Sequence, residues 1–592
     1  AEWPHYIFCM RSKLMKRVVL TSFIIIFPLI LIVPGFFDEN QGFYVDWWTN
    51  IWNIEYQSRY FSTHHSMPNI IHTWNIETGI GRPDALFYGF LFYPIMAFTA
   101  QFLGTNIALR LGIVIIWIMQ FFALKKVFSK LTNYPYFDYC VTALFLWGIY
   151  PLTNLYNRSA LPEFFATGLL LCALCYFFLF LWADLKTERN KNAIFFGICL
   201  VLCIGTHPIT ALFGGTFLFI TIFFCIVLKI SKLPQYLPLL LIIIFFCMLS
   251  VSPWLYVTFK FMGNLAISSA PGISIYSESI DWPLSRFLPF PMDKRSVIHG
   301  WQVPGGTPWL EAQMNMPLLL LLLWVFYSNR DRLRGLEIRD KVFIVFPLLL
   351  FLLTNVMSLS ASIWTILPSV YKNIQMVYRM VTYQNLSLVL ALISVYYVLW
   401  SKTESIKPNN SKGLLLVMTL CLSISFVAAT QKLMHGFAIM GDAEPLNLIN
   451  KKDFLSHPKT VGQANYILAS IPESGKESYR DIHIFPDPFD SKKNPEYDVM
   501  IRLEESSWIK TNIQAFPWNK LLLNGIPVPL HQYQRVGPYL SLLLPPGEHC
   551  LSYVAEPDNI YLVLKLLSWI VIVIWMTICG LIPFKGYFLV KD

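Results

Sequence analysis

Eight ionisable residues lie inside or beside strongly apolar stretches of this sequence. Charged groups at membrane depth are costly, so residues of this kind are candidates for function. They come from separate parts of the chain, and we expect them to converge on one cavity. They are Asp38, Glu39, Asp46, Arg110, Arg158, Glu163, His207 and Arg379.

Asp46 stands in the sequence YVDWW, after the first apolar run. A carboxylate among aromatic side chains at a membrane surface fits a general base, which takes a proton from a hydroxyl nucleophile. The alternative is a solvated acid in an aromatic belt, with Trp47 and Trp48 as surface anchors. Asp38 and Glu39 compete for the same role, but they stand at the usual solvated exit of a membrane span.

Arg158 and Glu163 flank a short turn, NLYNRSALPE, between two apolar runs. At the start of a helix they fit an ion pair, and the helix dipole favours Glu163 there. Arg158 equally fits a phosphate or pyrophosphate ligand, because a guanidinium fork matches phosphate oxygens. Both interpretations remain open at this point.

His207 in GTHPIT and Arg379 in MVYRMV also stand at the ends of apolar runs. Each fits a phosphate ligand or a packing role. His64, His65 and His72 do not have a recognised metal-ligand spacing and carboxylate support for them is thin, so we expect no metal site.

The composition is that of a membrane protein. Of the 592 residues, 55% are hydrophobic and 14% are charged, and the mean hydropathy is +0.52. Soluble domains carry about 25% charged residues. The net charge is +10, but Lys and Arg fall in short clusters between apolar runs, which gives a nucleic-acid partner little support and suits a topology signal.

Two rules predict an all-α polytopic fold with about 12 transmembrane helices. A span needs about 20 mostly apolar residues, and inside loops carry the Lys and Arg. They place both termini in the cytoplasm and an interfacial helix at 86–104. The predicted spans are 18–36, 106–124, 136–153, 164–183, 192–207, 210–228, 236–257, 316–328, 341–357, 381–400, 413–430 and 560–582.

The predicted topology divides the chain into a transmembrane module at 1–430, an outside segment at 431–559, and a last helix with a cytoplasmic tail at 560–592. Two long loops of the first module, 37–105 and 258–315, also lie outside. All three long segments therefore share the side on which chemistry is expected.

The segment 431–559 predicts a small extracytoplasmic β-domain before the last helix. Its short apolar runs are broken by Asn524-Gly525 and by Pro545-Pro546-Gly547. Such breaks are typical of hairpins, and Asn-Gly supplies the positive φ that a tight turn needs.

Several motifs resemble polytopic membrane glycosyltransferases of the GT-C type. In the predicted first outside loop an acid is followed by W-x-x-x-x-G-x-G-x-P and then by FY. The turn YNRSALPE resembles a second motif, Y-x-R-x-x-x-x-E. The segment IQMVYR resembles Q-x-P-x-R, with Val377 in place of the Pro. The matching residues are Trp74, Gly79, Gly81, Pro83, Phe87, Tyr88, Tyr156, Arg158, Glu163 and Arg379.

The C-terminal segment is similar to the β-domain of YfhO-like membrane proteins, through FPWNKLLLNG and LPPGEHCLSY. One departure concerns Asn50, because many relatives have a His a few residues after the acid.

The resemblance implies an enzyme of the bacterial inner membrane that moves a sugar from a polyprenyl-phosphate carrier to a glycan, lipid or protein acceptor on the outer face. Asp46 would be the base of an inverting displacement. The implied substrate-binding residues are Arg158, Glu163, His207, Arg379 and Trp74. No cofactor is expected, because arginines can neutralise a phosphate leaving group. The competing hypotheses are a transporter or flippase of a lipid-linked glycan and a non-catalytic membrane scaffold.

Overall fold

The computed structural model describes most of the chain, with gaps. The described residues are 3–38, 41–43, 45–68, 70, 73–75, 79–82, 89–132, 134–230, 233–261, 265–267, 313–368, 371, 377–402, 411–442, 466–468, 475, 478–482, 484, 499–537 and 539–581. The expected loop 258–315 falls largely outside them.

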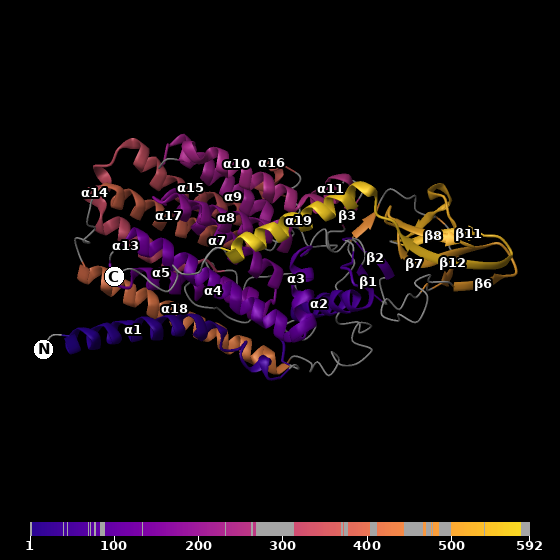
Figure 1. The fold of residues 1–592 in the computed structure, drawn as a ribbon, viewed down its shortest axis with the longest axis horizontal. Helices are drawn as coiled ribbons and strands as arrows, with labels where there is room; N and C mark the ends of the chain where they lie inside the picture. The colour runs from indigo at the N-terminus through magenta and orange to yellow at the C-terminus, as the bar shows by residue number, and fades with distance from the viewer. Residues whose placement is uncertain are drawn as a thin grey trace.

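Helices form one elongated bundle, and the strands of the C-terminal segment lie at one end of it (Figure 1). The α-helices are α1 Trp3–Leu29, α2 Val45–His64, α3 Phe92–Leu103, α4 Thr105–Leu131, α5 Phe137–Leu146, α6 Ile149–Leu152, α7 Leu161–Leu181, α8 Lys186–Thr206, α9 Pro208–Val227, α10 Leu233–Ser250, α11 Ser252–Phe261, α13 Met316–Ser328, α14 Arg330–Arg334, α15 Ile338–Leu359, α16 Ala361–Ile366, α17 Met380–Lys402, α18 Ser411–Asp442 and α19 Asn559–Leu581. Short 3₁₀ helices are η1 Pro34–Phe36, η7 Val377–Arg379 and η10 Leu530–Gln532, and η3 Thr153–Asn157 is a π-helix.

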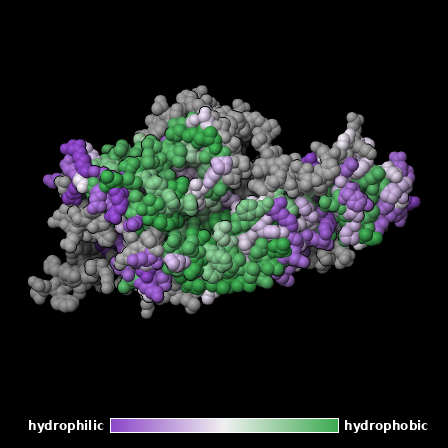
Figure 2. Space-filling model, turned by 90° about the horizontal axis from the view of Figure 1, so that it is seen from above, coloured by the Kyte–Doolittle hydropathy of each residue, from purple (hydrophilic) through white to green (hydrophobic). Residues whose placement is uncertain are grey.

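Among the described residues, six helices are long and apolar enough to cross a membrane, or seven if the bent pair α10 and α11 counts as one span. Figure 2 shows hydrophobic side chains gathered over the middle of the helical part, with hydrophilic ones at the end that carries α14 and again toward the strands. This pattern is compatible with a membrane protein. The predicted count of about 12 spans is not confirmed and stays a prediction.

The helix bounds depart from the predicted spans where the apolar run hides a break. The span predicted at 236–257 is two helices, α10 and α11, bent by 64°. Pro253 stands near the start of α11, where its missing N–H is tolerated. The helix α18 continues to Asp442, past the predicted boundary at 430.

The predicted outside loop 37–105 contains a helix that its composition did not indicate. The helix α2, Val45–His64, begins with Asp46 in its first turn. It packs against α3 and α4. Trp47 is fully buried and packs on Phe43, with a centroid distance of 5.1 Å, so the predicted role of Trp47 as a surface anchor is wrong.

The C-terminal segment folds into two sheets, and the bounds are β5 Arg480–Ile482, β6 Val499–Leu503, β7 Ser507–Gln514, β8 Asn519–Leu523, β9 Ile526–Pro527, β10 Gln534–Val536, β11 Tyr539–Leu544 and β12 Gly547–Ala555. One sheet has the order β6-β12-β8-β9, and the other contains β7, β11, β10 and β5. The Asn524-Gly525 hairpin is confirmed, with φ of 53° and 78° between β8 and β9. The predicted hairpin at Pro545 to Gly547 is wrong, because β11 pairs with β7 and β10 while β12 pairs with β6 and β8.

A hairpin from the predicted outside loop 37–105 completes the C-terminal sheet that contains β7. Its strands are β1 Thr73–Asn75 and β2 Gly79–Arg82, and β2 pairs with β7 in parallel at Ile80 and Ile513. Two further strands, β3 Leu265–Ile267 and β4 Tyr466–Leu468, pair with each other. The sheet that contains β7 is thus attached directly to the loop that carries α2.

Aromatic packing joins the sheets to the bundle. A separate buried cluster brings together residues from the first loop, α11, the β7–β8 connection and α19: Ile70, Val257, Phe261, Phe516, Trp518 and Tyr561. Lys260 and Asp558 form an ion pair of 2.8 Å beside it. These contacts fix one end of the bundle against the strands.

Candidate functional site

A buried carboxylate, Glu163, lies at the start of α7. Pro162 occupies the first turn of this helix and Glu163 follows it. Pro is preorganised for that turn, and a negative charge there is favoured by the helix dipole. Ser159, two residues before the start of α7, has φ of +54°, which is uncommon for a residue with a side chain. This turn separates α7 from the π-helix η3, an element that is frequent at functional sites.

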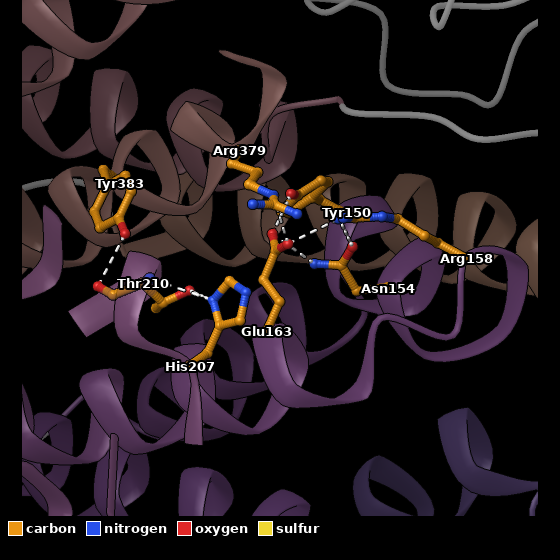
Figure 3. Close-up of polar contacts among 8 residues, drawn as sticks. All are labelled: Tyr150, Asn154, Arg158, Glu163, His207, Thr210, Arg379 and Tyr383. Atoms are coloured by element: carbon orange, nitrogen blue, oxygen red, sulfur yellow. Dashed lines mark hydrogen bonds and ion pairs between the residues drawn. The ribbon is translucent and has the colours of Figure 1, made fainter. Parts of the chain in front are cut away.

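Two arginines and two neutral donors converge on Glu163 (Figure 3). Arg158 donates from Nη1 to Oε2 at 2.8 Å, and Arg379 Nε lies 3.1 Å from the same oxygen. The other oxygen, Oε1, accepts hydrogen bonds from the Tyr150 hydroxyl at 2.6 Å and from Asn154 Nδ2 at 3.3 Å. The ion pair of Arg158 with Glu163, one of the two predicted interpretations, is confirmed.

The two arginines reach Glu163 from distant parts of the chain. Arg158 follows η3 directly, whereas Arg379 ends η7, immediately before α17. Both are buried, at 8% and 6% exposure. The Arg158 guanidinium also lies 5.3 Å from the centroid of the Tyr378 ring, so an aromatic face adds to its stabilisation.

Asp46 is partly buried, in the first turn of α2. Burial raises the pKa of its carboxyl above the ordinary value of 3.8, while the charges of Arg158 and Arg379 act in the opposite direction and Glu163 adds to the rise. Asp46 therefore lies within electrostatic reach of both arginines. A carboxyl with a raised pKa is suited to accepting a proton near neutral pH.

Asn50 holds α2 in this position. Its Nδ2 donates to the backbone oxygen of Asp46 at 2.6 Å and to that of Ser159 at 3.3 Å. Its Oδ1 accepts a hydrogen bond of 2.9 Å from the Tyr93 hydroxyl. One amide thus links the helix of Asp46 to the turn after Arg158 and to α3.

His207 lies in the turn between α8 and α9 and caps α9. Its Nδ1 is 2.7 Å from Thr210 Oγ1 and accepts a hydrogen bond of 3.3 Å from Thr210 N. Tyr383 donates to Thr210 O at 3.1 Å. Burial lowers the pKa of His207 to about 3, and the charge of Arg379 acts in the same direction. The ring is therefore neutral at pH 7 and adds no positive charge to the site.

Arg110 is not part of this cluster. Its guanidinium donates to the backbone oxygens of Ile32, at 3.0 Å, and of Gln41, and lies 5.0 Å from the ring centroid of Trp47. The guanidinium packs directly against the backbone of Gly35, because a Cβ added there would lie 1.8 Å from Cζ of Arg110. Arg110 therefore holds the chain between α1 and α2.

Trp74 belongs to β1, in the hairpin that completes the C-terminal sheet, and nothing described brings it to the Glu163 cluster. Asp38 is exposed, and Glu39 lies outside the described residues. His64 and His65 are exposed at the end of α2. The part of the chain that the structure describes contains no group of three or more His, Cys, Asp and Glu residues arranged to hold a metal ion.

Sequence reasoning did not assign Tyr150, Asn154 or Asn50 to the site, and Asn50 drew notice only as a departure from the family pattern. Tyr150 and Asn154 come from α6 and η3, and Asn50 from an unpredicted helix. The stretch YPLTN looks like the end of an apolar run. A buried carboxylate needs donors nearby, and that requirement could have directed attention to polar residues before Glu163.

The charges of the cluster nearly balance. Arg158 and Arg379 oppose Glu163, so the buried core carries one net positive charge, and ionised Asp46 cancels it. Arg158 contacts Glu163 and Asn154 through Nη1, and Arg379 contacts Glu163 through Nε. The arrangement suits an anion that meets the arginines beside a carboxylate able to take a proton.

Comparison with known proteins assigns no family to this geometry. No protein-family model, no curated protein and no solved structure matches the chain.

Proposed function

We propose that the chain is an integral-membrane glycosyltransferase that moves a sugar from a polyprenyl-phosphate carrier to an acceptor on the extracytoplasmic face. The observation that carries this proposal is the position of Asp46, partly buried and within electrostatic reach of Arg158 and Arg379. The charges of two arginines then act on the carboxylate that would accept the proton. The predicted resemblance to GT-C enzymes agrees with this chemistry.

In the proposed reaction the acceptor hydroxyl gives its proton to the Asp46 carboxylate. The acceptor oxygen forms a bond to the anomeric carbon of the sugar from the side opposite the phosphate. The bond between that carbon and the phosphate oxygen breaks, and its electron pair stays on the phosphate. The two arginines stabilise this charge as it develops.

Glu163 has a positioning role in this proposal, not a substrate-binding one. It is buried at 2% exposure and holds one nitrogen of each guanidinium. Fixed guanidinium groups need no reorganisation when the leaving group forms. His207, being neutral, contributes through the cap of α9, and the β-domain would present or select the acceptor.

The test is Asp46→Asn in the cell of origin, followed by analysis of the outer-surface glycan. We expect the glycan modification to be lost at normal protein level, because an amide cannot accept the proton. The matched control is Asp138→Asn, since Asp138 also lies in the first turn of a helix and is partly buried. An unchanged glycan in the Asp46 variant would refute the base assignment.

A lipid-linked glycan transporter is the second candidate. The 64° bend between α10 and α11 favours it, because transporters bind substrate at broken helices. Vesicles that carry the purified protein distinguish the two. Movement of a lipid-linked sugar between leaflets without transfer to any acceptor would favour the transporter.

A further inference from the structure

A small cavity lies beside the Glu163 cluster, inside the helical bundle. A water-sized sphere has about 20 Å³ in which its centre can move. Polar side chains from five elements line it: Gln120, Tyr150, Asn154, Thr167, Thr382 and Asn385. A cavity needs about 10–15 Å³ by this measure to hold one water molecule. The cavity is therefore large enough for one water molecule, and polar side chains belong to its lining although most of its accessible surface is apolar.

Two hydroxyl groups on its wall lack a partner among the described residues. Thr167 Oγ1 and Thr382 Oγ1 are inaccessible to solvent and make no hydrogen bond there. Buried polar groups are nearly always paired, with protein or with ordered water. Because both threonines line one cavity of sufficient size, a polar ligand that both hydroxyls reach would account for both.

We propose that this cavity binds ordered water that bridges α7 and α17. Thr167 lies one helical turn after Glu163, and Thr382 lies three residues after Arg379. A bridge between the two threonines therefore holds α7 and α17 together about one helical turn from the ion pair of Glu163 and Arg379. The inference does not depend on the proposed glycosyltransferase activity.

The chemistry of the surroundings selects a neutral ligand. Tyr150 and Asn154 line the cavity and also donate to Glu163. The adjacent charges are two guanidinium groups against one buried carboxylate, which disfavours a bound metal cation. Water donates and accepts, so it can pair with threonine hydroxyls and with the amides of Gln120 and Asn385.

X-ray radiolytic labelling of the purified full-length protein in nanodiscs tests the proposal. Radicals formed from bound water hydroxylate the side chains next to it, even where bulk solvent has no access. Phe164 and Tyr150 line the cavity, and Phe177 is a fully buried residue of the same helix as Phe164 that does not. We expect Phe164 and Tyr150 to be labelled several-fold faster than Phe177.

Two variants extend the test. Thr382→Val replaces the hydroxyl by a methyl group of similar size, and we expect it to reduce the labelling of Phe164 without raising the melting temperature. Thr382→Ser keeps the hydroxyl and should keep the labelling. Equal labelling of Phe164 and Phe177 in the wild type would overturn the proposal. So would a Thr382→Val variant with unchanged labelling and a higher melting temperature, because a dry cavity gains from losing an unpaired hydroxyl.

Discussion

Glu163→Gln should destabilise the protein strongly, since Glu163 is the buried counterion of both Arg158 and Arg379. The substitution keeps the size of the side chain and an oxygen for the Tyr150 hydroxyl, but removes the charge. Breaking a buried ion pair from one side typically costs about 3–5 kcal/mol, because the partner charge stays buried without compensation. Two guanidinium groups lose their counterion here, so we expect a loss in the free energy of unfolding at the upper end of that range.

The measurement is unfolding in mixed micelles as the fraction of denaturing detergent is raised. Glu188→Gln is the matched control, because Glu188 lies 3.9 Å from Lys126 in a pair whose side chains are 36% and 31% exposed. Exposed pairs contribute about 0–1 kcal/mol. Adding Arg379→Met to Glu163→Gln should recover part of the stability, since one uncompensated charge is removed. A Glu163→Gln variant as stable as the control would refute the account of the cluster.

Three further predictions address the site and its support. Transfer should decline on the acid side with an apparent pKa above 3.8, because Asp46 must be ionised and burial raises its pKa; an acid limb at or below 3.8 in a pH profile would argue against this. His207→Gln should keep the affinity for polyprenyl phosphate, measured by binding in nanodiscs, because His207 is neutral at pH 7; a loss beyond about tenfold, or 1.4 kcal/mol, would contradict it. Gly81→Ala should release the β1–β2 hairpin and speed limited proteolysis between α2 and α3. Gly81 has φ of +85°, and a Cβ added there would lie 2.0 Å from Asn519 Nδ2. Gly475→Ala is the control, because an added Cβ there meets nothing within 4 Å.

The positions of many helices follow from the sequence alone. The helix α13 has the predicted bounds, 316–328, because its apolar run is limited by the capping residue Asn315 and by Arg330. The capping side chain accepts a hydrogen bond from Leu318 N at 3.1 Å. Breaks inside apolar runs, as between α10 and α11, leave hydropathy unchanged and were therefore not predicted.

The sequence does not predict the helix α2, because no apolar run marks it. Its twenty residues, Val45–His64, mix aromatic and polar side chains and show no dominant apolar face. Tertiary contacts with α3 and α4 stabilise it, and such contacts cannot be read from local propensity.

The site was predicted in part. Arg158 and Glu163 are close in sequence, so their pairing follows from spacing. Arg379 is more than 200 residues away from Glu163, as the residue numbers show, and only the packing of η7 and α17 brings it there. The role expected for Trp74 stays a prediction, and its motif does not reveal that the strand β1 joins the sheet of β7 through β2.

The most direct test of the central claim is single-turnover sugar transfer in proteoliposomes, with a panel of polyprenyl-phosphate-linked hexoses as donors. Wild type and Asp46→Asn are compared for donor binding and for transfer. The account predicts that the variant binds the donor as the wild type does and transfers about 10²- to 10⁴-fold more slowly, the usual contribution of a general base. Transfer at the wild-type rate by the Asp46→Asn variant would contradict it.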